Sequence, residues 1–150
     1  MYGPRSIRLI SPAALVLALG AIGCASTTGG ESRVRTAEAI VGKLWQWEAM
    51  VTPAEKIEVP TPDRYTFELL PDGKVAARLD CNRGAGTYQI ADGKIAFSPM
   101  ASTRAACPPG SLDTRFARDL GRAASFFVER GKLYLELPAD SGTMGFRPAG

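Results

Sequence analysis

The sequence has 150 residues, of which 45% are hydrophobic and 22% charged, values that are typical of a globular protein and exclude a disordered or fibrous one. This length has room for one domain with one core. The formal net charge is +3, and acidic and basic residues are interspersed, so the sequence does not show the basic stripe expected of a nucleic-acid-binding protein.

Residues 1–23 are predicted to be a secretory signal peptide. Arg5 and Arg8 precede an apolar run over residues 9–23, which is the order of segments in such signals. The run is too short and too rich in small residues for a transmembrane helix, which needs about 20 apolar residues. Its end, A-I-G-C, resembles the bacterial lipobox. That resemblance implies that Cys24 receives a diacylglycerol thioether; the alternative is an ordinary cysteine at the end of a cleaved peptide.

Residues 24–40 are predicted to be a lipidated cysteine followed by a flexible tether, and residues 41–148 a folded domain. The polar tract at 25–32 has the composition of a flexible linker. Several acyl chains on one residue would hold the protein at a membrane. Ala25 stands where an Asp would resemble an inner-membrane retention signal, so we expect an outer-membrane lipoprotein that faces the periplasm.

The folded domain is expected to begin with a short helical turn and a strand. The turn is placed at residues 36–41. Apolar residues alternate over residues 44–51, which predicts a strand with Trp45 and Trp47 on its inward face. Prolines bound an irregular stretch at residues 53–62.

Two β-hairpins are predicted in the middle of the chain. Alternating apolar residues flank P-D-G at 71–73 and, further on, D-G at 92–93. Turn residues between two alternating runs are the pattern of a hairpin. Gly84 and Gly86, which lie between the hairpins, are expected in a tight turn after Cys81.

One helix and three strands are expected in the last third. Apolar residues recur with helical spacing over 112–124, and Ser111 is a plausible helix cap. Alternation resumes at 126–128, 133–137 and 144–146. Because a sheet with one polar face must bury its other face, the helix is its expected cover. The predicted fold class is mainly β (α+β), an antiparallel curled sheet or half-barrel packed around one amphipathic helix.

The cysteines favour a disulfide. Once Cys24 is assigned to lipid, Cys81 and Cys107 remain as a pair in an oxidising compartment. Metal binding is a weak alternative because the sequence contains no histidine and two thiolates fall short of the usual four zinc ligands. A redox-active pair is disfavoured because the two do not form a C-x-x-C motif.

Two motifs resemble a known family. D-C-N-R-G-A-G-T-Y at 80–88 and S-T-R-A-A-C at 102–107 are similar to the two signatures of the META domain, the family of HslJ-like bacterial proteins. The resemblance covers roughly residues 41–147. It implies a half-barrel of antiparallel strands with a packed helix, found in envelope proteins linked to stress, and no established catalytic activity.

The sequence carries no recognisable catalytic or cofactor-binding set. The absence of histidine removes the commonest general base and a usual ligand of catalytic zinc. We therefore expect a protein that is not an enzyme and has no cofactor or bound metal. An enzyme or enzyme inhibitor is the third-ranked alternative.

A disulfide between the two motifs would gather polar residues into a candidate interaction surface. Its members are Asp80, Asn82, Arg83, Thr103 and Arg104. Polar loops held by a rigid scaffold are common recognition sites. The alternative is structural: Asn82 caps a turn and Thr103 satisfies backbone groups. Arg104 then pairs with Asp80.

Two functions follow from these expectations. The first is a membrane-anchored, non-enzymatic interaction module that binds an envelope protein and supports envelope integrity or a stress response. The second is a binding module for a lipid or a small apolar ligand, held in the cupped sheet beside Trp45 and Trp47. Core packing is the alternative role of these two tryptophans.

Overall fold

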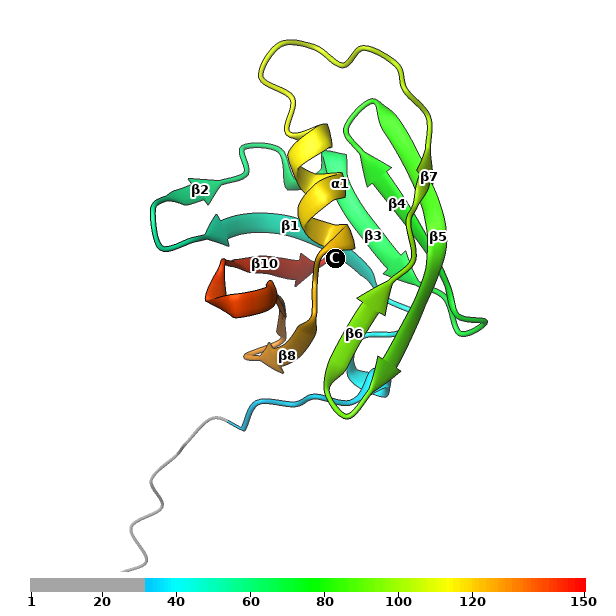
Figure 1. Cartoon of the computed structure of the whole chain (residues 1–150), viewed down its shortest axis with the longest axis vertical. Helices are drawn as coiled ribbons and strands as arrows, with labels where there is room; N and C mark the ends of the chain where they lie inside the picture. The colour runs from blue at the N-terminus through cyan, green and yellow to red at the C-terminus, as the bar shows by residue number, and fades with distance from the viewer. Residues whose placement is uncertain (1–31) are drawn as a thin grey trace, which may run out of the picture.

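The computed structural model describes residues 32–150, which form an antiparallel barrel with one α-helix (Figure 1). The barrel strands are β1 (Leu44–Val51), β3 (Tyr65–Leu69), β4 (Lys74–Leu79), β5 (Asn82–Ala91), β6 (Lys94–Phe97), β8 (Ser125–Glu129), β9 (Lys132–Glu136) and β10 (Thr143–Pro148). The remaining elements are the short strands β2 (Lys56–Glu58) and β7 (Ala101–Ser102), the helix α1 (Asp113–Gly121), and the 3-10 turns η1 (Ala37–Ala39), η2 (Pro62–Arg64) and η3 (Pro138–Asp140). The mainly β class and both predicted hairpins are confirmed.

The barrel is more closed than the predicted curled sheet or half-barrel. β1 pairs with β10 from Trp45↔Pro148 to Val51↔Thr143, which joins the first barrel strand to the last. Closure satisfies backbone groups that an open edge would leave unpaired. The weakest seam lies between β6 and β8, where the register contains only the pair Lys94↔Ser125.

One face of the helix packs against the barrel core through Phe116 and Leu120. Phe116 on α1 is fully buried and stacks on Trp47, with ring centroids 5.1 Å apart. The Tyr65 ring lies edge-on to both rings, with centroid distances of 5.9 Å. Trp45 is 1% exposed, and its indole N–H donates to the Ile40 carbonyl at 3.0 Å. The prediction of a ligand groove at Trp45 and Trp47 is therefore wrong, because other core side chains occupy that space.

The packed domain starts earlier than residue 41. Val34 exchanges two backbone hydrogen bonds with Val128 on β8, at 2.9 and 2.7 Å. The Arg33 guanidinium lies 4.4 Å from the centroid of the Phe127 ring, and Ile40 is fully buried. The later part of the predicted tether is thus docked on the barrel. Cys24 lies outside the described residues, and no helix within residues 32–150 is long and apolar enough to cross a membrane.

The barrel has two distinct ends. The chain enters at the N-terminal end, where Arg35 lies against Gly93 in the β5–β6 turn. The loop end carries the β4–β5 turn and residues 103–112, drawn at the top of Figure 1. β5 runs between these ends, and its ten residues span about 33 Å at roughly 3.3 Å per residue.

Candidate functional site

A disulfide fastens the long loop to the barrel at the loop end. Cys81 and Cys107 are bonded, with their Cα atoms 5.5 Å apart. Cys81 follows Asp80, which turns the chain between β4 and β5 with a φ of 59°. Asp is among the residues that tolerate this left-handed region best. The bridge therefore brings the two sequence motifs together.

Asn82 connects the same two segments by hydrogen bonds. Its Nδ2 donates to the Ala105 carbonyl at 3.0 Å and to Asp113 Oδ2 at 3.3 Å. Its Oδ1 accepts from Thr103 Oγ1 at 2.9 Å and from the Ala105 N–H at 2.8 Å. Asn82 is only 4% exposed. It is therefore mainly a connecting residue of the loop end, with little of its side chain exposed to a partner.

Replacing Asn82 by Ala is expected to lower the free energy of unfolding by about 3 kcal/mol, since it removes a buried amide that makes four hydrogen bonds to residues 103, 105 and 113. Urea denaturation followed by tryptophan fluorescence measures the change. Gln89→Ala, at an exposed position of the same strand, is the matched control and should change stability by less than about 0.5 kcal/mol. Equal stability of the two variants would refute the connecting role of Asn82.

The other residues of the predicted interaction surface differ in whether they are engaged within the domain, exposed or both. Asp80 is 5% exposed and forms an ion pair with Arg64, so its predicted alternative pairing with Arg104 is wrong. Thr103 is occupied by Asn82 and by the Arg83 N–H, which donates to its hydroxyl at 3.0 Å. Arg83 and Arg104 are exposed. Thr103 is also exposed, so the part of the predicted surface that is open to a partner consists of Arg83, Thr103 and Arg104.

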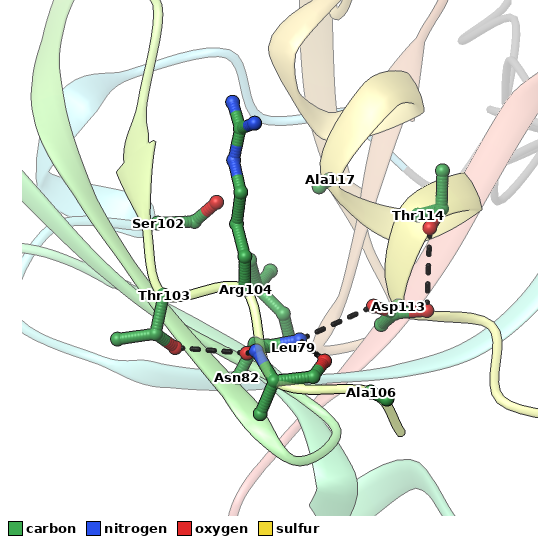
Figure 2. A pocket seen from close by; sticks show the side chains of 10 residues that line it. Leu79, Asn82, Ser102, Thr103, Arg104, Ala106, Asp113, Thr114 and Ala117 are labelled. Carbon is green, nitrogen blue, oxygen red and sulfur yellow. Dashed lines mark hydrogen bonds between the residues drawn. The ribbon is translucent and has the colours of Figure 1, made fainter. Parts of the chain in front are cut away.

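Arg104 lies at a pocket of about 410 Å³ between α1 and residues 102–106 (Figure 2). Leu79 and Ala117 supply apolar lining, while Ser102 and Asn82 add polar groups. Figure 2 shows the Arg104 side chain in an extended conformation, with its guanidinium group drawn above Ala117.

A second pocket of about 280 Å³ continues along the helix. It shares Leu79, Ser102 and Ala117 with the first and adds Phe97, Ser98, Pro99, Met100, Arg118, Gly121 and Arg122. We call the two together the α1 groove. One wall is α1, and the other is the segment of residues 97–106 that contains β7.

The charge of the α1 groove is organised by a buried carboxylate. Asp119 is 1% exposed and accepts two hydrogen bonds from Arg118, at 2.8 and 3.1 Å. Hydrogen bonding and the charge of Asp119 raise the pKa of Arg118 above its usual value. Arg122 lies 3.9 Å from the same carboxylate. Arg104 forms no ion pair with any residue in the described part of the chain, so the groove carries excess positive charge.

The chemistry that this arrangement offers is recognition through hydrogen bonds, positive charge and a small apolar floor. Within residues 32–150, no three His, Cys, Asp or Glu side chains are grouped so as to hold a metal ion.

A family model described as META domain matches residues 38–149, a range that includes both motifs, the disulfide and α1. The chain belongs to the META domain family. The predicted resemblance is therefore confirmed. In this META domain the two signature motifs are the segments that Asn82 and the disulfide join.

Solved structures show the same fold at low sequence identity. An NMR structure of a protein from Burkholderia xenovorans is 21% identical, with a TM-score of 0.66, and the match covers 93% of this chain and 97% of the other. The crystal structure of a duf4847 family protein from Bacteroides vulgatus is 14% identical, with a TM-score of 0.56 and coverage of 73% and 94%. No curated protein matches the sequence significantly.

The META domain's motif glycines lie in a strand and not in the predicted turn, and the α1 groove was not predicted from the sequence. Gly84 and Gly86 lie within β5, so their predicted tight turn is wrong. A Cβ on Gly86 would come within 3.1 Å of Met100 Cγ, and one on Gly84 within 3.3 Å of Leu79 Cδ1. The glycines let residues 98–102 pass close to the barrel. They were the sequence signal that another segment packs closely alongside β5 there.

Proposed function

We propose that this protein is a membrane-anchored envelope lipoprotein whose META domain is a non-enzymatic interaction module. The observation that supports the proposal best is the separation of the two barrel ends. The chain enters at Val34 and Arg35, whereas the disulfide and the α1 groove lie toward the other end of β5. An anchor at Cys24 would leave the loop end directed away from the outer membrane, toward partners in the periplasm.

Recognition fits the loop end better than catalysis does. Its hydroxyl and amide groups are used in hydrogen bonds within the domain, as Asn82 and Thr103 show. The disulfide and these bonds hold a loop in one shape, which lowers the entropy lost when a partner binds. The competing proposal of a small apolar ligand has lost its motivating site, because Trp45 and Trp47 are core residues.

The test is photo-crosslinking in intact cells that express the full-length chain. A photoreactive amino acid replaces Ala106 at the loop end or, as the matched control, Ala91 at the N-terminal end; both positions are exposed. We expect one discrete protein adduct from position 106 and a much weaker one from position 91. We also expect labelling by an alkyne fatty acid, which the Cys24→Ser variant loses together with its membrane association.

Two results would contradict the proposal. The first is an absence of protein adducts from the loop end under several envelope stresses. The second is unchanged fatty-acid labelling and membrane association in Cys24→Ser, which would remove the anchor.

A further inference from the structure

We propose that the α1 groove binds an extended, acidic segment of a partner polypeptide, laid along the free edge of β7. The inference rests on the proposed interaction role, and it adds the site of contact and the chemistry of the partner. Three observations support it: an unpaired strand edge, an excess of guanidinium groups, and a narrow apolar floor.

The strand edge comes from β7. This strand pairs with β5 on one side only, through Gly84↔Ser102 and Ala85↔Ala101. The Thr103 N–H donates to the Arg83 carbonyl at 3.0 Å. Because hydrogen-bonded pairs alternate along an antiparallel ladder, the N–H and C=O of Ser102 point away from β5. Neither group has a backbone partner elsewhere in residues 32–150, so an extended peptide can add to this edge.

The charges select an acidic peptide. Arg104, Arg118 and Arg122 line the groove against a single acidic residue, Asp113. The Asp113 carboxylate already accepts from Asn82 Nδ2 at 3.3 Å and from Ser111 Oγ at 3.3 Å. A partner with carboxylates would therefore meet complementary charge at the rim.

Arg115 also lies near the groove's buried carboxylate, because its Nε is 3.6 Å from Asp119, which Arg118 and Arg122 share. Three guanidinium groups thus surround one carboxylate on α1. Arg115 has its own acidic neighbour, since its Nη2 lies 2.6 Å from Glu55, so the excess positive charge at the groove comes from Arg104, Arg118 and Arg122.

The apolar floor of the α1 groove favours a partner segment in which apolar and acidic side chains alternate. Leu79 is buried beneath both pockets, Ala117 is half-buried beside it, and the flexible Met100 lines the far part. Side chains of a strand alternate between its two faces. One face of the bound segment would contact this floor, and the other would bring its carboxylates to the arginines. The pocket volumes of about 410 and 280 Å³ are sufficient for the side chains of a short extended segment.

The experiment measures peptide binding to the purified full-length chain. The probe is a short fluorescein-labelled peptide in which Glu and Val alternate, compared with an otherwise identical peptide of Gln and Val. Fluorescence anisotropy should show binding of the Glu peptide that is about tenfold tighter than that of the Gln peptide and weakens with added salt. Amide chemical shifts should change at Ser102, Arg104 and Ala117.

Two groove variants and one control test the location. Arg104→Glu and Ala117→Gln should each weaken binding about tenfold, the first by charge and the second by filling the floor. Arg147→Glu, an equal charge reversal at an exposed position of β10, should bind as the native chain does. Circular dichroism of each variant confirms that the barrel is folded.

The groove proposal is overturned if the Glu peptide fails to bind at millimolar concentration or binds no better than the Gln peptide. Shift changes confined to another face, or equal effects of Arg104→Glu and Arg147→Glu, overturn it as well. A protein adduct from position 106 together with such a result would leave the interaction role standing without the groove. The absence of any adduct would remove the interaction role itself.

Discussion

Replacing Phe116 by Ala is expected to lower the free energy of unfolding by about 4 kcal/mol, within the usual range for loss of a buried aromatic ring. The ring is 0% exposed and lies among Trp47, Tyr65 and Phe146. These rings belong to strands on the β1 side of the barrel. Because the strands are fixed by their pairing, the rings cannot move easily to fill the cavity that Ala leaves. Urea denaturation at neutral pH measures the loss.

The matched control is Thr114→Ala on the exposed face of the same helix. Its hydroxyl makes one long hydrogen bond to Asp113, at 3.4 Å, so the change should be below about 0.5 kcal/mol. If Phe116→Ala were also this mild, α1 would be a detachable cover, and the closed barrel would be stable without it.

Removing the disulfide by changing Cys81 and Cys107 to Ser is expected to lower the free energy of unfolding by about 3.5 kcal/mol. The two cysteines are 26 positions apart, and freeing a loop of that length restores conformational entropy to the unfolded chain. The measurement is the urea midpoint of the oxidised native chain against that of the double variant.

A reductant provides the control. It should destabilise the native chain by a similar amount and leave the double Ser variant unchanged. Asn82 retains its bonds to Ala105 and Thr103 in both cases, so the barrel should stay folded while residues 103–112 become more mobile. A double variant as stable as the oxidised native chain would show that hydrogen bonds alone hold the loop.

Local patterns predicted the elements that form between neighbours in sequence. The hairpins at Pro71-Asp72-Gly73 and Asp92-Gly93 follow from turn residues between alternating runs. The helix follows from its apolar spacing. Closure of the barrel did not follow, because the pairing of Trp45 with Pro148 joins strands nearly a whole domain apart, and alternation within a strand does not identify its partner.

The candidate site shows the same division. The motifs correctly predicted that Asn82 and Thr103 lie together. Residue type alone, however, could not show that the Asn82 amide is buried. β7 has only two residues, too few to show alternation. Nothing in the helical pattern distinguishes Arg118 and Arg122, which belong to the candidate site because the fold places residues 97–102 opposite them.

The pairing of β1 with β10 also constrains how this domain is made. The ring can be sealed only after β10 has been synthesised, although β1 is available from the start. Until then, the partly formed barrel exposes one edge of β1 and one edge of β9, both rich in backbone groups that can pair with another chain. Such distant pairing generally slows folding. We therefore expect the interval before β10 joins the barrel to be the stage most prone to aggregation.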